Sequence, residues 1–254
     1  DFYLAPNGVT CMCPDANFGD TGDPGNGIVY TKRVRNDITS QNASTSCTSG
    51  ITDFSFMFNS ATTFNQDITS WDVSNVTDMN EMFSYANSFN QPIGYWDVSS
   101  VTNMNSMFLS ASAFNQPIGD WDVSQVTDMT LMFNEGSFNQ PIDNWDVSNV
   151  TQMSGMFNGA TAFNQPLNSW NTSNVGNMQF MFSNASSFNQ DLNNWNVSSV
   201  EQMAEMFSVS AMNGLIDSWD VSSVIDMHGM FQFSPFNQDL NNWDVSSVQN
   251  MEVM

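Results

Sequence analysis

Three groups of residues in this sequence have types and spacings that could do chemistry: cysteines, a basic run and a periodic row of carboxylates. The cysteines are Cys11, Cys13 and Cys47. A Cys-x-Cys pair rarely closes on itself, so we expect one of the first two to form a disulfide with Cys47. Such a bridge is typical of an oxidising compartment and would leave the third thiol free or intermolecular. The alternative is a metal site, although no histidine lies near these cysteines.

All the basic residues of the chain lie in one run, TKRVR, and they are Lys32, Arg33 and Arg35. One interpretation is local pairing with nearby carboxylates such as Asp15 or Asp37. The other is a basic patch that docks on the acidic body or tail of a second copy, which would build a filament. The sequence leaves both interpretations open.

The charge balance limits the kinds of partner. Asp and Glu total 26 against 3 Lys and Arg, a formal net charge of -23 at pH 7. Such a field repels phosphates and anionic membrane surfaces, so we expect no nucleic-acid partner and no membrane insertion. No apolar run approaches the roughly 20 residues that a membrane span requires.

A carboxylate or an amide follows every tryptophan. Repeats that stack would align these side chains, which are Asp72, Asp97, Asp122, Asp146, Asn171, Asn196, Asp220 and Asp244. The structural interpretation is that each accepts hydrogen bonds from backbone amides of a turn beside a helix N-terminus, where negative charge is favourable. The functional alternative is a row of calcium sites, because oxygen ligands suit a hard cation. No sequential Asp-x-Asp-x-Asp loop is present.

The remaining polar residues form no catalytic constellation. His228 is the only histidine, so any Ser-His or Cys-His mechanism would depend on this one side chain. We find no nucleophile–base pair, no phosphate-binding loop and no cluster of metal ligands. We therefore expect a protein that is not an enzyme and needs no cofactor, with calcium as the one candidate ion.

Six Asn-x-Ser/Thr sequons are candidate glycosylation sites. They are Asn42, Asn75, Asn149, Asn171, Asn184 and Asn196. Some arise by chance in a chain rich in Asn and Ser, and they matter only if the source is a eukaryote or its virus.

A repeat must position all these residues. The tryptophans recur every 24 or 25 residues, at Trp71, Trp96, Trp121, Trp145, Trp170, Trp195, Trp219 and Trp243. This period is typical of proteins built from stacked repeats. One unit reads FNQPIGYWDVSSVTNMNSMFLSASAF. No unit can bury its Phe, Trp and Met alone, so neighbouring units must complete the core.

The second half of the unit has helical spacing. Val76, Met79, Phe83 and Ala86 fall at i, i+3, i+7 and i+10, which predicts the buried face of a short helix. Ser74 is placed to cap that helix through its hydroxyl.

The first half of the unit, FNQPIGYW, is short and often carries proline. It predicts an extended segment with one short strand, stacked in parallel on its neighbours. The asparagine after each Phe is expected to form a ladder that satisfies backbone groups from one coil to the next. The expected fold class is therefore an α/β repeat solenoid with leucine-rich-repeat-like coils, each a short parallel strand plus a short helix.

Two regions follow from the extent of the repeat. Residues 1–46 lack it and are expected to form an N-terminal cap, whereas residues 47–254 hold about eight repeats of 24–25 residues, the last one incomplete. The sequence stops in mid-unit at Met254. We expect either that the natural chain continues or that a partner subunit covers this edge.

The unit FNQDITSWDVSNVTDMNEMF resembles the repeat of the BspA-like leucine-rich-repeat surface proteins, which include the mycoplasma-type surface lipoprotein repeat. The resemblance covers about residues 51–254. It implies a leucine-rich-repeat-like solenoid in an extracellular setting, with adhesion or surface-coat roles. The family has no common catalytic residues.

The sequence thus predicts a secreted or cell-surface protein that acts as an adhesion or surface-coat module through its exposed faces. Its partners would be other copies of itself, or proteins or glycans of a host or cell surface. The alternative is a structural subunit of an extracellular filament, joined end to end through the cap and the open C-terminal edge.

Overall fold

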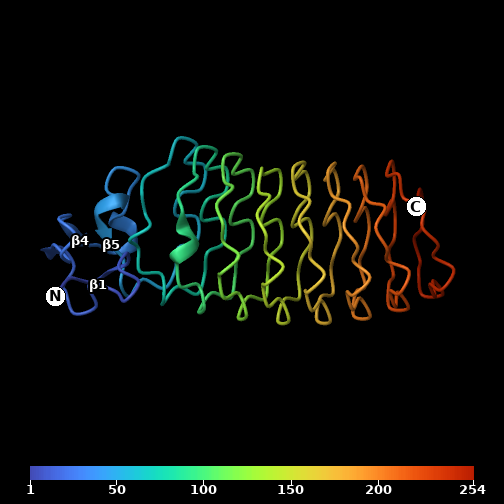
Figure 1. Cartoon of the computed structure of the whole chain (residues 1–254), viewed down its shortest axis with the longest axis horizontal. Coiled ribbons are helices and arrows are strands. Elements are labelled where there is room, and N and C mark those ends of the chain that lie inside the picture. Colours follow the sequence, from blue (N-terminus) through green and yellow to red (C-terminus); the bar gives the residue numbers. More distant parts are fainter.

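The structure, a computed structural model, describes residues 1–254 as an elongated row of coils behind a small cap (Figure 1). It contains no α-helix, and none of its short helices has the length or hydropathy to cross a bilayer. Its regular elements are β1 (Tyr3–Leu4), β2 (Cys11–Met12), β3 (Thr21–Gly22), β4 (Tyr30–Lys32), β5 (Ser46–Cys47) and the 3-10 helices η1 (Arg35–Asp37), η2 (Ala43–Thr45) and η3 (Ile93–Tyr95).

Two small sheets form the cap. β1 pairs antiparallel with β2, while β4 pairs antiparallel with β3 and in parallel with β5. The amide of Cys11 donates to the carbonyl of Ser70 at 2.8 Å. This bond fixes β2 on the first coil, so the cap covers one end of the stack.

The helix predicted in the second half of each unit is wrong. In the first full coil, the amides of Met82, Ser84 and Ala86 donate to carbonyls three residues earlier, at 3.0 to 3.2 Å. In the same segment, Glu81 and Tyr85 have positive φ angles of 51° and 57°. A helix cannot pass through left-handed residues, so the segment is instead a ribbon of successive tight turns.

The remaining amides of each turn ribbon bond to the next coil. For example, Phe83 donates to the carbonyl of Met107 at 2.9 Å. Eight isolated parallel bridges mark the same register along the stack, from Asp53 to Asn250. Parallel pairing therefore runs through the segment predicted as helical. The predicted strand in FNQPIGYW does not form, and the α/β fold class is wrong.

The apolar spacing was compatible with both structures because both repeat about every four residues. Left-handed residues recur at intervals of four within each ribbon, which brings Met79, Phe83 and Ala86 to one side, as a helix would. All three are fully buried. The prediction was right about the core and wrong about the backbone, since the carbonyls of the next coil replace the acceptors that a helix provides internally.

The core consists of columns of identical side chains. The Phe column from Phe58 to Phe231 has seven stacked neighbour pairs, with ring centroids 5.5 to 5.9 Å apart. Each of the eight indoles donates through Nε1 to a carbonyl nearer the N-terminus, at 2.8 to 3.2 Å. Trp71 reaches Ala43 in η2, and the others reach the preceding coil. Each buried indole N–H is thus satisfied.

The expected asparagine ladder is confirmed. Oδ1 of Asn65 accepts from the amide of Asn90 at 2.9 Å, and Nε2 of Gln91 donates to the same oxygen. The amide link occurs seven times in all, as far as Asn237, at 2.7 to 3.0 Å. These side chains join the FNQ corners of neighbouring coils.

Candidate binding faces

Two residues of each turn ribbon hold left-handed backbone, and they line up along the stack as two rows. We call these rows the left-handed columns. They lie ten and fourteen positions after each tryptophan, with equivalent places in the ribbon before Trp71. The first column is Phe56, Glu81, Ser106, Leu131, Gly155, Phe180, Glu205, Gly229 and Val253, and the second is Ser60, Tyr85, Ser110, Glu135, Gly159, Asn184, Val209 and Phe233.

Glycine fills only three of these places, although left-handed backbone favours it. The other fourteen residues, with φ between 51° and 60°, are all the non-glycine residues of the chain that have positive φ. The conformation costs an L-residue about 1–2 kcal/mol, and glycine avoids this cost. A β-branched residue such as Val209, or a bulky one such as Phe180, is strained most. Larger side chains at these places therefore call for a reason other than stability.

Most side chains of the second column face solvent. Val209 is 44% exposed, Tyr85 46% and Phe233 82%, and Phe56 of the first column is 53% exposed. Residue type changes from coil to coil in both columns, whereas the buried positions beside them repeat. The first column is mostly half-buried or buried, so the invariant framework presents its variable surface chiefly along the second column, which is how repeat proteins build binding faces.

Sequence reasoning did not find the left-handed columns. The signal was the variation itself, because in a strict repeat the positions that change are those that the framework does not determine. Variation in residue type does not indicate a backbone conformation, so the left-handed strain was visible only in the structure.

The structure joins Cys13 to Cys47 through a disulfide with an S–S distance of 2.04 Å. Cys11 is free and fully buried. Burial, together with the nearby charge of Asp72, raises the pKa of the Cys11 thiol to about 12. The thiol therefore stays protonated at neutral pH, which makes it a poor nucleophile and a poor metal ligand.

The three cations of the basic run bond within their own chain. Nζ of Lys32 donates to the carbonyls of Cys13 and Pro14, each at 2.9 Å, and Lys32 is only 7% exposed. Nη1 of Arg33 donates to the carbonyl of Thr45 at 2.8 Å.

Arg35 of the same run contacts the first coil. Its Nη2 donates to the carbonyl of Ser55, and its Nε lies 4.0 Å from Oδ1 of Asp53. Neither Asp15 nor Asp37 is the ionic partner of a base. The run holds the cap together and fastens it to the stack.

The aspartates that follow the tryptophans each close a turn. In all six, Oδ1 accepts from the amide of the serine two residues later, at 3.0 to 3.2 Å. Ser74 therefore caps no helix, and its hydroxyl donates to Asp72 at 2.7 Å. At Asp146, the hydrogen bonds from Ser148 hold the pKa of the carboxyl below its usual range.

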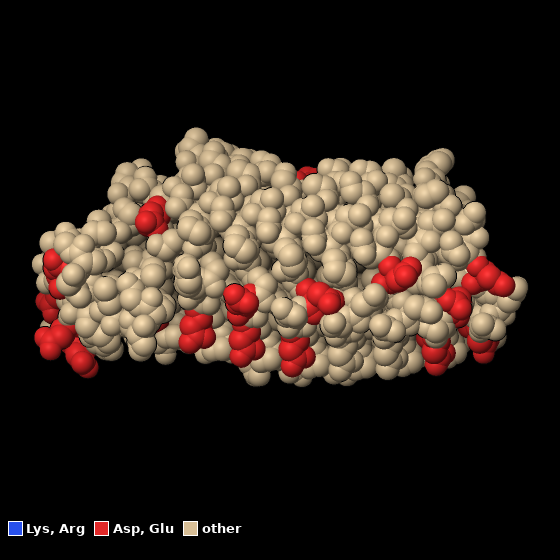
Figure 2. Space-filling model, in the orientation of Figure 1, with Lys and Arg blue, Asp and Glu red and all other residues tan.

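The structure brings these aspartates into no metal cluster. No group of three or more His, Cys, Asp or Glu side chains that could hold a metal ion is present in the chain. Acidic side chains gather along one edge of the face in Figure 2, which shows no basic side chain.

Five of the six candidate glycosylation sites are exposed, and the sixth, Asn42, is partly buried. The side chain of Asn42 donates to the carbonyl of Asp37 and accepts from the amide of Thr39. The exposed sites are Asn75, Asn149, Asn171, Asn184 and Asn196.

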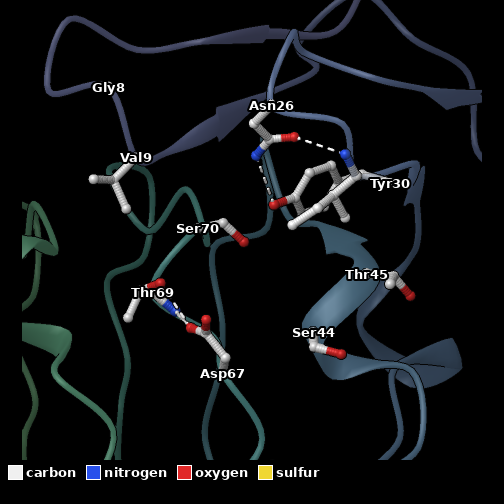
Figure 3. A pocket seen from close by; sticks show the side chains of 10 residues that line it. Gly8, Val9, Asn26, Tyr30, Ser44, Thr45, Asp67, Thr69 and Ser70 are labelled. Atoms are coloured by element: carbon white, nitrogen blue, oxygen red, sulfur yellow. Dashed lines mark hydrogen bonds between the residues drawn. The ribbon is translucent and has the colours of Figure 1, made fainter.

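A cavity of about 420 Å³ lies between the cap and the first coil (Figure 3). On the cap side, Nδ2 of Asn26 donates to the hydroxyl of Tyr30 at 3.2 Å. On the coil side, the amide of Thr69 donates to Oδ1 of Asp67 at 3.0 Å. The walls carry hydroxyl and amide groups and one carboxylate, with no nucleophile–base pair.

The stacked coils define this chain as a repeat protein, and a comparison with known families agrees. The family model described as "Mycoplasma protein of unknown function, DUF285" matches residues 30–137, 118–213 and 208–254. These overlapping matches cover most of the chain, so the chain belongs to this repeat family. No curated protein matches the sequence.

Proposed function

We propose that this chain is an extracellular adhesion or surface-coat module that binds its partner through the left-handed columns. The observation that carries the proposal is the placement of all fourteen non-glycine left-handed residues in these two rows. Each costs stability that glycine would restore, and their side chains differ from coil to coil. Contact with a partner is a function that such side chains serve and glycine does not.

Three further observations support an extracellular setting. The Cys13–Cys47 disulfide suits an oxidising compartment. No Lys or Arg follows Arg35, so the stack offers trypsin no cleavage site. The repeat also resembles that of the BspA-like surface proteins.

The same features favour some partners over others. With a net charge of -23, we propose a protein or glycan partner and neither nucleic acid nor the bilayer. We also propose that the chain is not an enzyme, since His228 is its only histidine and lies within a turn ribbon. The filament alternative has less support, because the cations that would dock on a second copy bond to the cap or to the first coil of their own chain.

An adhesion assay with two matched variants tests the proposal. Beads coated with the chain are placed on arrays of glycans and of extracellular-matrix proteins, and retained beads are counted. The column variant replaces four residues by glycine: Tyr85, Glu135, Val209 and Phe233. The control variant replaces four turn residues by asparagine, which keeps the turn bonds: Asp122, Asp146, Asp220 and Asp244.

We expect the column variant to lose retention on the surfaces that hold the wild-type chain, and the control variant to keep it. Retention of the column variant at the wild-type level would reject the columns as the binding face. Failure of the wild-type chain to bind any surface above bare beads would reject adhesion.

A further inference from the structure

Tyr95 stands between two cavities on the first coils of the stack. One cavity, of about 310 Å³, is lined by the cap around Asn7 and by Asp72, Ser74 and Asp97. The other, of about 450 Å³, extends over the next two coils. Tyr95 lines both cavities and is 67% exposed, so a ligand in either cavity can contact its side chain.

Close approach of the backbone shapes the second cavity. A Cβ atom on Gly94 would lie 2.5 Å from the carbonyl oxygen of Pro117, and one on Gly119 would lie 2.6 Å from that of Pro141. Only glycine fits at such distances. Two successive Pro-Ile-Gly segments thus pack closely on the coil that follows, and their prolines and glycines line the cavity beside Tyr95.

The first cavity has a buried carboxylate in its wall. Asp72 is 4% exposed, whereas the equivalent aspartates of later coils are exposed, because the cap covers only the first coil. Its Oδ1 accepts from Ser74, but its Oδ2 is buried and has no hydrogen-bond partner. A carboxylate so placed is unfavourable unless positive charge compensates it.

The chain itself supplies no such charge. The cations of Lys32, Arg33 and Arg35 bond to other groups. Two more carboxylates line the cavities, those of Asp97 and Asp120, and both residues are exposed. Three successive coils thus contribute one carboxylate each around one aromatic ring.

An aromatic face beside carboxylates is the chemistry that recognises a guanidinium group. Its planar cation stacks on the ring and also donates hydrogen bonds to carboxylate oxygens. An ammonium group gains less binding free energy from such a site, because it is a compact and strongly hydrated point charge. A neutral ligand would leave the negative charge uncompensated.

We propose that the Tyr95 cavities bind an arginine side chain of a protein partner. This inference deepens the proposed function, because it presumes that the chain is a binding module and names the chemistry of its partner. It uses a surface distinct from the left-handed columns.

Calorimetric titration with a capped glycine peptide that carries two arginines tests the proposal. Tyr95→Ser and Asp97→Asn each introduce a residue that other coils carry at the same position, so we expect both variants to fold. Asp122→Asn is the matched control, because it removes the same charge from the same turn one coil further on. Circular dichroism confirms folding of each variant before titration.

We expect Tyr95→Ser and Asp97→Asn to raise the Kd about tenfold and Asp122→Asn to leave it within about twofold. The same peptide with lysines should bind more weakly. Equal weakening by Asp97→Asn and Asp122→Asn, or equal binding of the lysine peptide, would show diffuse charge attraction and overturn the site. Absence of binding to the wild-type chain would also overturn it.

The two proposals fail separately in these experiments. The column variant keeps Tyr95 and all six turn aspartates, so it should bind the arginine peptide as the wild-type chain does. Loss of bead retention with intact peptide binding supports the columns alone. Loss of peptide binding in the column variant would show that the two surfaces are not distinct, and this result would overturn the site as proposed.

Discussion

Replacement of Val209 by glycine should stabilise the protein. Val209 has a φ of 55° and is 44% exposed, and its amide donates to the carbonyl of Gln232 at 2.7 Å. Glycine keeps this backbone bond and relieves about 1–2 kcal/mol of left-handed strain. The added freedom of glycine in the unfolded chain offsets about 0.5–1 kcal/mol of that gain. The expected net increase in the free energy of unfolding is therefore about 0–1.5 kcal/mol.

Urea unfolding followed by tryptophan fluorescence measures this difference, since every full coil carries a buried indole. Val29→Gly is the control, because Val29 is 60% exposed and is not among the residues with positive φ. We expect this control to lower the free energy of unfolding by about 0.5–1 kcal/mol through chain entropy alone. Opposite signs for the two variants would show that position 209 is strained.

Equal destabilisation by Val209→Gly and Val29→Gly would refute the reasoning. It would mean that the valine at position 209 is held without strain, and that glycine has no advantage there. The left-handed columns would then carry no strain that a binding role would explain.

Three further predictions concern the core, the cap and the turns. Trp145→Phe should lower the free energy of unfolding by about 0.5–1.5 kcal/mol in urea, because the carbonyl of Ile118 loses the indole N–H at 3.1 Å and keeps only the backbone amide of Trp121 as a donor; an unchanged midpoint would contradict the indole ladder. Cys11 should resist iodoacetamide at pH 8 in the folded protein and react after unfolding, as followed by mass spectrometry. Rapid labelling of the native thiol would contradict its burial. Because the pKa of Cys11 rises from 9.0 to about 12 on folding, the free energy of unfolding should fall as the pH rises through this range. Asp146, whose pKa is lowered by Ser148, should contribute stability above pH 4 that is lost on acidification; an Asp146→Asn variant with the same acid dependence would contradict it.

The sequence predicted which residues form the core because burial follows the repeat directly. Val76, Met79 and Phe83 recur in every coil and are fully buried. The asparagine ladder was also predictable, because an identical polar residue in each stacked coil must meet its neighbour. Both inferences depend on the spacing between coils and not on the backbone within one coil.

The backbone of the turn ribbon could not be inferred in the same way. A helix and a ribbon of turns place apolar residues at nearly the same intervals, and the choice between them depends on acceptors in the next coil. Those acceptors, such as the carbonyl that Met107 offers to Phe83, exist only once the coils stack. Intrinsic backbone propensities disfavour left-handed conformations of residues such as Val209, so they could not predict these conformations either.

The Tyr95 cavities were outside the reach of sequence reasoning for a related reason. Asp72 has the same sequence context as the aspartates of later coils, and only the cap distinguishes it by covering it. The pairing of Cys13 with Cys47 likewise depends on how the cap folds against the first coil. The sequence allowed either Cys11 or Cys13 as the partner.

Detection of hydrogen bonds between coils in solution tests the helix-free stack most directly. NMR scalar couplings across hydrogen bonds connect an amide nitrogen to the carbonyl carbon that accepts from it. Stacked coils without helices should give a coupling from the amide of Phe83 to the carbonyl of Met107. A coupling from Phe83 to Met79 within the same coil, the pairing of an α-helix, would contradict the helix-free stack and the left-handed columns built on it.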